Sequence, residues 1–291
     1  MINFNKFYKL FNIISFILML GSILLLIVKG LNFGVDFKGG TLIELRTTNN
    51  EINVTTLRKS FNKMNLGDVN VKKFGKDNDY LIKFEKKDIE PNTIEKIKID
   101  LTNLIGNTFN FRRVENVGPK VSSELLKSGM IAILVSLAAM LFYIWIRFEW
   151  QFSLGAILAL FHDIIITLGF FSLFSLEINL SIVAAVLTIV GYSMNDTVVI
   201  FDRVRENLRK FSDIKIYELT NISINETLSR TIITSVTTLL ALLSIYIFGG
   251  EILKGFSFAM ILGVIFGTYS SIYIANPVLV RLRVSQKTII K

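Results

Sequence analysis

The stretch "INLSIVAAVLTIVGYSMNDTVVIF" (residues 178–201) decides the fold class, because it is long and apolar enough to cross a membrane as one helix. About 20 apolar residues in a helix span a hydrocarbon layer about 30 Å thick. Asn195 and Asp196 nevertheless lie near the end of this span, where a charged side chain costs at least about 2.5 kcal/mol on insertion scales. A carboxylate in such a place is a candidate functional group.

The composition of the whole chain agrees with a membrane protein. Hydrophobic residues make up 52% of the 291 residues and charged residues 19%, whereas charged residues make up about 25% of ordinary soluble domains. The mean hydropathy is +0.54. The basic residues behind the net charge of +9 lie between apolar stretches or at their ends. This pattern is typical of membrane-facing segments and argues against a nucleic-acid partner.

The residue types that the chain lacks exclude several kinds of chemistry. It has no cysteine and a single histidine, which excludes disulfides, thiol catalysis, iron–sulfur clusters and a histidine-rich metal site. Its sequence also contains no phosphate-binding glycine loop and no nucleophile elbow. We therefore expect no cofactor, no metal and no enzymatic activity, and any work would draw on an energy source other than ATP.

Six stretches are long and apolar enough to be membrane spans. They lie near residues 11–29, 129–146, 152–175, 178–201, 230–248 and 256–280. Lysine and arginine are held on the cytoplasmic side of short connectors. Twelve of these residues flank the predicted inner ends, and the two short outer connectors hold only Lys254. This distribution predicts that both termini are cytoplasmic.

The spans and their orientation divide the chain into three predicted parts. They are 1–30 with the cytoplasmic N-terminus and the first span, 31–127 as an extracytoplasmic domain, and 128–291 with the other five spans, a cytoplasmic connector at 202–228 and the cytoplasmic C-terminus. Within the connector, "SDIKIYEL" (212–219) predicts a short interfacial helix. "SINE" (223–226) matches a capping box, in which Ser223 caps a helix that runs straight into the fifth span and Glu226 reaches back.

The extracytoplasmic segment has the pattern of a small folded domain. Its elements are predicted as strand 39–46, helix 53–65, strands 69–75 and 79–85, helix 91–106 and strand 108–118. Asn53 is a candidate N-cap, Pro91 opens the second helix, Gly106 closes it, and Gly75 lies in a turn. The order βαββαβ predicts an α+β, ferredoxin-like domain with an antiparallel sheet and both helices on one face.

Polar side chains inside the spans predict a proton path. Asp196 and Arg230 lie in antiparallel spans at similar depths in the inner half of the membrane, so they can pair, and protonation would break and remake the pair. The supporting polar residues that we expect along the path are Asn195, Thr234, Ser235, Tyr192, His162 and Asp163.

Other interpretations of these polar residues stay open. Asp196 and Arg230 could form a static ion pair that fixes helix register, or both could extend to the inner interface. His162 and Asp163 also fit a packing or hydrogen-bonding role. Gly263 and Gly267 predict close helix packing without chemistry.

Five stretches of the chain resemble one family in order and topology. They are "GVDFKGGTLIEL" (34–45), "VENVGPKVSSELL" (114–126), "HDIIITLGFFSL" (162–173), "GYSMNDTVVIFDRVREN" (191–207) and "LSRTIITSVTTLLALLSIYIFGG" (228–250). They are similar to the SecF family of the bacterial Sec protein-export machinery. SecF and SecD belong to the resistance–nodulation–division superfamily, whose six-span units couple a proton gradient to work on the outer side.

The resemblance implies an auxiliary subunit of the Sec preprotein translocase in the bacterial cytoplasmic (inner) membrane, driven by the proton-motive force together with a SecD-like partner. It also implies contacts with the SecYEG channel, with YajC and YidC, with translocating preproteins and with membrane lipids. In the family, the aspartate of "NDT" and the arginine of "SRT" are proton-conducting, and they correspond to Asp196 and Arg230. Asp36, Gly39 and Gly40 match the family's entry into the outer domain, where the glycines predict a turn with positive φ.

Two other functions fit some of the same features. A proton-driven exporter of small molecules or lipids could belong to the same superfamily, although such exporters usually carry two large outer domains in one long chain. A non-conducting scaffold of the translocation channel would need no proton path. Unchanged export in an Asp196→Asn variant under a full proton gradient would point to the scaffold.

Overall fold

The structure is a computed structural model. It describes residues 1–48, 52–64, 66–67, 69–73, 78–84, 93–106, 109–211 and 214–289. Gly75 and Pro91, which the sequence places in a turn and at a helix start, lie outside the described residues. The chain forms two compact units, one made of Met1–Asn32 with Ile131–Lys291 and the other of Phe33–Met130.

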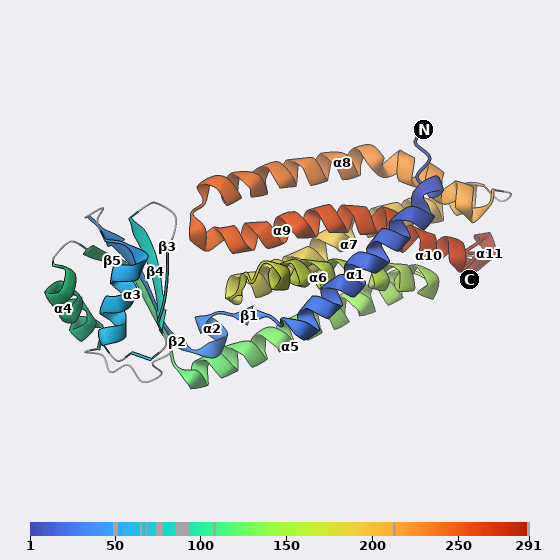
Figure 1. Ribbon diagram of the computed structural model, residues 1–291. Helices are drawn as coiled ribbons and strands as arrows, with labels where there is room; N and C mark the ends of the chain where they lie inside the picture. The colour runs from blue at the N-terminus through green and yellow to red at the C-terminus, as the bar shows by residue number, and fades with distance from the viewer. Residues whose placement is uncertain are drawn as a thin grey trace. The chain divides into compact units, whose positions relative to one another are not determined.

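The first unit is a bundle of long helices (Figure 1). Its main helices are α1 (Tyr8–Val28), α5 (Pro119–Arg147), α6 (Trp150–Leu173), α7 (Leu180–Lys210), α8 (Ile216–Phe248) and α9 (Glu251–Ser270), and α9 continues through the π-helix η2 (Ser271–Ala275) into α10 (Asn276–Arg281). The short elements are η1 (Asn5–Phe7), β1 (Asn32–Phe33), β6 (Glu177–Ile178) and α11 (Gln286–Ile289). Within the described residues, six helices are long and apolar enough to cross a membrane, which confirms the six predicted spans.

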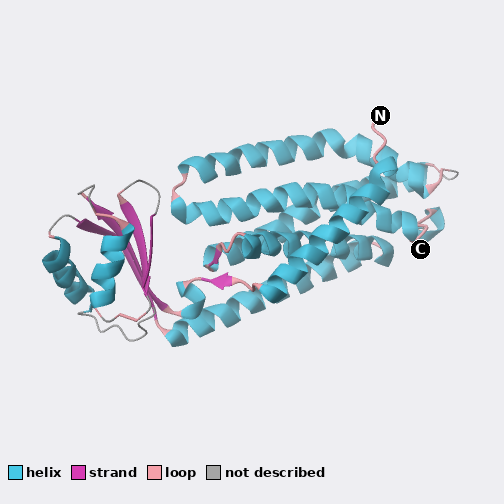
Figure 2. Ribbon diagram, in the orientation of Figure 1, coloured by secondary structure: helices cyan, strands magenta, loops and turns pink. Residues whose placement is uncertain are grey.

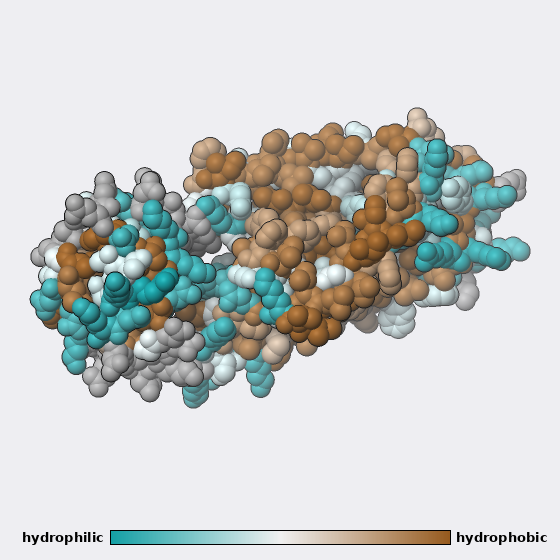
Figure 3. Space-filling view, viewed as in Figure 1, coloured by the Kyte–Doolittle hydropathy of each residue, from teal (hydrophilic) through white to brown (hydrophobic). Residues whose placement is uncertain are grey.

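The six helices differ in how deeply they are buried. In the apolar part of each span, half or more of the residues are buried in α6 (56%), α7 (50%) and α9 (56%). The buried share is much smaller in α1 (11%), α5 (6%) and α8 (17%). The apolar surface of the bundle is visible in Figure 3. Polar side chains on the inner three helices therefore have to find partners on one another, because an unpaired polar group is costly in an apolar interior.

Close packing of α7 against α9 depends on two glycines. A Cβ added to Gly263 would overlap the side chain of Ile189, and one added to Gly267 would lie 3.2 Å from the backbone of Ser193. The predicted packing role of this glycine pair is confirmed. The absence of side chains at both positions lets polar groups on the two helices reach one another.

The second unit contains a four-stranded antiparallel sheet with the order β3-β4-β2-β5 (Figure 2). Its elements are α2 (Val35–Lys38), β2 (Gly40–Thr47), α3 (Val54–Lys63), β3 (Val69–Lys73), β4 (Asp79–Phe84), α4 (Thr93–Ile105) and β5 (Phe109–Val117). Both long helices contribute to one apolar core with the sheet, through residues such as Ile43, Leu57 and Leu101. The predicted βαββαβ order is confirmed.

Two local helix signals of this unit also hold. The side chain of Asn53 accepts a hydrogen bond from the backbone N–H of Thr56 at 2.9 Å, as an N-cap does. Gly106 follows α4 with φ of +75°, a conformation that favours glycine at a helix end.

In the 202–228 connector, the predicted helix that runs straight into the fifth span is confirmed, but the predicted helix start at Ser223 is wrong. A single helix, α8, runs from Ile216 to Phe248, so Ser223 lies inside the helix and caps nothing. The Ser223 hydroxyl donates to the carbonyl of Leu219 at 2.9 Å, one turn back. Glu226 bonds to α7 instead of reaching back along its own helix. The capping-box pattern failed because both side chains have tertiary partners.

Candidate functional site

Asp196 lies on α7 with its side chain turned into the bundle. The residue is only 3% exposed. Its Oδ2 accepts a hydrogen bond from the Thr268 hydroxyl of α9 at 3.3 Å. Thr268 in turn shares a hydrogen bond of 2.7 Å with the hydroxyl of Ser235 on α8. A carboxylate and two hydroxyls thus connect three helices inside the bundle.

Arg230 does not make the predicted contact with Asp196. Among the residues that the structure describes, no ion pair joins the two side chains, and Asp196 bonds to Thr268 instead. Thr231 and Ser235 are one turn apart on α8 and both are buried, whereas Arg230 is exposed. Successive residues of a helix point about 100° apart. The face of α8 that brings Ser235 inward therefore leaves Arg230 outside.

A second carboxylate, Asp163 on α6, is completely buried, with an exposed fraction of 0%. Its Oδ2 accepts hydrogen bonds from the hydroxyls of Ser193 on α7 at 2.6 Å and Ser270 on α9 at 2.7 Å. Its Oδ1 lies 2.9 Å from Nδ1 of His162. Partners from three helices surround this carboxylate, which is the arrangement that a buried acidic group requires.

His162 lies beside Asp163 and is also buried. Its ring stacks on that of Tyr269, with centroids 5.8 Å apart. The Tyr269 hydroxyl donates to the carbonyl of Phe11 and contacts Ser15, both at 2.7 Å. Within the described part of the chain, Nε2 of His162 has no hydrogen-bond partner. The Asp163 cluster is therefore linked to α1 through an aromatic pair.

The remaining residues predicted along the path fall into two groups. Asn195 is exposed, and the Thr234 hydroxyl bonds to the carbonyls of Arg230 and Thr231 in its own helix. Tyr192 is half-buried, and its hydroxyl lacks a partner among the described residues. The structure thus links Asp196 to Ser235 through Thr268 and places Asp163 and His162 in a separate cluster. Asn195 is exposed and belongs to neither group.

The outer-domain motif has the backbone that its glycines predict. Asp36 belongs to the short helix α2, which Gly39 ends with φ of +78°, and Gly40 follows with φ of +120°. These values lie where a side chain would be strained. The two glycines therefore allow the chain to turn from α2 directly into β2.

Sequence reasoning missed the contribution of α9. Thr268, Tyr269 and Ser270 all contact groups of the site, yet none was predicted to belong to it. The signal that could have revealed them is "GTYSS" (267–271), a run of hydroxyl-bearing residues inside an otherwise apolar span. A π-helix, Ser271–Ala275, follows this run directly, and such turns are frequent at functional sites.

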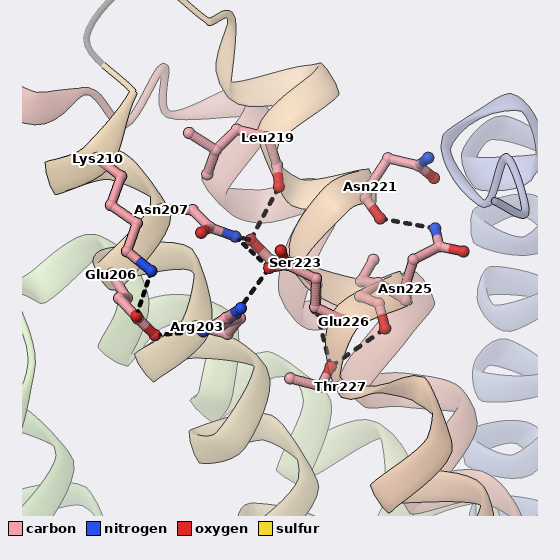
Figure 4. A network of polar contacts seen from close by, with 11 residues as sticks. Arg203, Glu206, Asn207, Lys210, Leu219, Asn221, Ser223, Asn225, Glu226 and Thr227 are labelled. Atoms are coloured by element: carbon pink, nitrogen blue, oxygen red, sulfur yellow. Dashed lines mark hydrogen bonds and ion pairs between the residues drawn. The ribbon is translucent and has the colours of Figure 1, made fainter.

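A second polar network joins the ends of α7 and α8 (Figure 4). Glu226 accepts hydrogen bonds from Nε of Arg203 and Nδ2 of Asn207, both at 2.7 Å. Arg203 and Lys210 also bond to Glu206, each at 2.6 Å. The network ties together the ends of the two helices that carry Asp196 and Ser235.

The N-terminal segment is bound by two asparagines of α8. The side-chain oxygen of Asn225 accepts from the backbone N–H of Ile2, and that of Asn221 accepts from the N–H of Phe4, both at 2.8 Å. The side-chain amides of both asparagines donate to the carbonyl of Ile2. Four hydrogen bonds therefore fasten this segment to one face of α8.

The comparison with known proteins agrees with this architecture. Residues 97–285 match the family described as protein export membrane protein SecD/SecF, C-terminal, and residues 24–51 match the SecD/SecF GG motif. The protein translocase subunit SecF of Rickettsia bellii is 47% identical over 95% of this chain and 92% of its own. The chain belongs to the SecF family. A SecF from Cereibacter sphaeroides is 42% identical over 94% of this chain and 86% of its own.

Solved structures support the same fold. The crystal structure of SecDF, a translocon-associated membrane protein from Thermus thermophilus, has a TM-score of 0.87 and 34% identity over 97% of this chain. SecDF in its super-membrane-facing form has a TM-score of 0.71 and 33% identity. This chain spans 38% of the length of either SecDF chain. SecF membership and six apolar helices together identify a multi-pass inner-membrane protein and a subunit of a protein translocase.

Proposed function

We propose that this SecF-family subunit uses the proton-motive force, together with a SecD partner, to drive or complete the translocation of preproteins. The observation that carries the proposal is a carboxylate, Asp196, which is 3% exposed inside a membrane bundle and, among the described residues, accepts one hydrogen bond, from the Thr268 hydroxyl. Such groups are costly to place in a membrane, so they are functional hypotheses by default. The partner is inferred because the chain spans only 38% of the SecDF chain that it resembles.

The proposed orientation places both termini, the C-terminal end of α7 and the N-terminal end of α8 in the cytoplasm. Residues 31–127 then lie outside. The distribution of lysine and arginine supports it. With this orientation, translocating preproteins would meet the sheet-containing domain outside. The SecYEG channel, YajC and YidC are the further partners that the family resemblance implies.

In the proposed mechanism, Asp196 binds a proton from one side of the membrane and releases it to the other. Binding removes a negative charge from the bundle interior, where charge interacts strongly. A proton that crosses the membrane yields about 2.3 kcal/mol per 100 mV, enough to shift a two-state equilibrium more than about tenfold. Arg230 is exposed on α8, and its positive charge would act on Asp196 without a direct contact. The sheet-containing domain would then follow as a rigid body.

The test is export of a preprotein into inverted membrane vesicles that contain the chain and its SecD partner, with the gradient imposed or collapsed. We expect the gradient to stimulate export by the native chain and to have no effect with Asp196→Asn. The matched control is Asn195→Ala, which changes the exposed neighbour and should leave stimulation intact. Equal stimulation in native and Asp196→Asn vesicles, at equal protein levels, would show a scaffold instead.

A further inference from the structure

The hydroxyl pair between Asp196 and α8 has a direction that depends on the charge of the carboxylate. A hydroxyl carries one proton to donate and can accept two. When Asp196 is ionised it can only accept, so the Thr268 proton points to Asp196, and the 2.7 Å bond to Ser235 must use the Ser235 proton. The ionised state therefore fixes both hydroxyls in one orientation.

Protonation of Asp196 makes the opposite orientation available. The carboxyl group then carries a proton of its own and can donate to Thr268, which frees the Thr268 proton for Ser235. The Ser235 proton in turn becomes free for another acceptor. One protonation event on α7 thus changes the hydrogen bonding of α9 and α8 without requiring any heavy atom to move.

The segment of α9 that holds Thr268 also contacts the other buried carboxylate. Ser270, two residues later, donates to Asp163. Gly267, one residue earlier, packs on the backbone of Ser193, whose hydroxyl also donates to Asp163. A single turn of α9 is therefore bonded to both Asp196 and Asp163, and the π-helix follows it directly.

We propose that Thr268 is a positioning residue for Asp196 and that, with Ser235, it transmits the ionisation of Asp196 to α8 and α9. The inference rests on the proposed function, because it assumes that Asp196 changes its ionisation during export. Thr268 is the required link, since it is the residue that contacts both the carboxylate and the α8 hydroxyl.

The experiment compares three variants of α9 in the inverted-vesicle export assay, each with the SecD partner. Thr268→Val keeps the branched shape and removes the hydroxyl, and Thr268→Ser keeps the hydroxyl. The control is Ser257→Ala, because Ser257 lies on the same helix and is more deeply buried than the half-buried Thr268, but its hydroxyl bonds to carbonyls of its own helix. We expect Thr268→Val to lose about tenfold in gradient-stimulated export, and Thr268→Ser and Ser257→Ala to stay within about twofold of the native chain.

A spectroscopic readout separates positioning from packing. The carbonyl stretch of a protonated carboxyl group moves to higher frequency when the group loses a hydrogen bond. In infrared difference spectra of chains with labelled aspartate, the band that disappears in Asp196→Asn belongs to Asp196. We expect Thr268→Val to shift this band upward and Thr268→Ser to leave it near its native position.

The possible outcomes are distinct. Native export and an unshifted band in Thr268→Val would overturn the proposal. So would equal losses in Thr268→Val, Thr268→Ser and Ser257→Ala, because packing alone would then explain them. If Thr268→Val does not accumulate in the membrane, Ser235→Ala tests the same link, and native export in that variant would overturn the transmission to α8. Retained stimulation in Asp196→Asn would instead refute the proposed function itself.

Discussion

The surroundings of Asp163 and Asp196 differ in the number of partners that each carboxylate has. Asp163 has three side-chain partners from three helices and is fully buried. Within the described part of the chain, Asp196 has one side-chain donor, at 3.3 Å, and Arg230 is exposed. Many fixed donors hold one protonation state, whereas few donors let the state change at a small structural cost. The difference fits a structural role for Asp163 and the proposed proton-binding role for Asp196.

The largest expected effect separates the two carboxylates by stability. In Asp163→Asn, the amide can no longer accept from Ser193, Ser270 and His162 together, so we expect a loss of ~3 kcal/mol in the free energy of unfolding. Asp196→Asn should cost less than about 1 kcal/mol, because its single donor can still bond to the amide oxygen. Thermal unfolding of the purified complexes measures both values. Equal destabilisation of the two variants would remove the distinction.

The next effect concerns the approach of α9 to α7, on which both carboxylate sites depend. Gly263→Ala would force a methyl group into Ile189, and we expect it to lower the free energy of unfolding by ~2 kcal/mol and to weaken gradient-driven export. Gly191→Ala is the control, because a Cβ there has open space around it. Native stability in Gly263→Ala would mean that α9 can move away without loss.

A smaller effect tests how Arg230 acts on Asp196. Because Arg230 is exposed and makes no direct contact with Asp196, the charge should matter more than the shape of the side chain. We expect Arg230→Ala to lose about tenfold in gradient-stimulated export and Arg230→Lys to lose less than about threefold. The vesicle assay measures both. A lysine variant as defective as the alanine variant would indicate a directional contact formed during the cycle.

The smallest effect contrasts the bundle with the sheet-containing domain, where Lys83 should make stability depend on pH. Burial, together with Lys72 and Lys38, lowers the pKa of Lys83 to about 8. An unfolded lysine has a pKa of about 10.4. Between about pH 8 and this value, the unfolded state binds more protons than the folded state, so the free energy of unfolding of the domain increases as pH rises. We expect slower limited proteolysis of this domain in the full chain at pH 10 than at pH 8.

The matched variants for this pH effect are Lys83→Met and Lys96→Met. Lys83→Met should abolish the pH dependence of proteolysis, once the protease's own pH profile is corrected with an unstructured substrate. Lys96 is an exposed lysine of α4, and its replacement should leave the native slope. A slope that survives in Lys83→Met would assign it to another group.

Much of the fold follows from local features of the sequence. Spans are visible because each is a continuous apolar run, and the sheet-containing domain is visible because its strands and helices alternate with clear turn and cap residues such as Asn53 and Gly106. Gly39 and Gly40 could be assigned positive φ because they match the family's entry into the outer domain and because glycine adopts positive φ without strain. These features need no knowledge of the tertiary structure.

The site was harder to predict because its contacts depend on which face each helix turns to its neighbours. Thr268 lies 72 positions after Asp196, and no spacing rule connects them. Equal depth suggested that Arg230 would pair with Asp196, but the rotation of α8 brings Ser235 inward instead. Ser223 failed as a cap for a related reason, since its tertiary partner Asn207 lies on another helix.

The binding of the N-terminal segment by α8 has a consequence for synthesis of the chain. Ile2 and Asn225 are 223 positions apart, so the start of the chain has no docking site until the ribosome has produced most of the protein. Until then, Ile2 and Phe4 lack these hydrogen-bond partners, and the end of the bundle that holds the N-terminal segment cannot close. Docking of the N-terminal segment at this end of the bundle can therefore occur only after α8 has been synthesised and inserted.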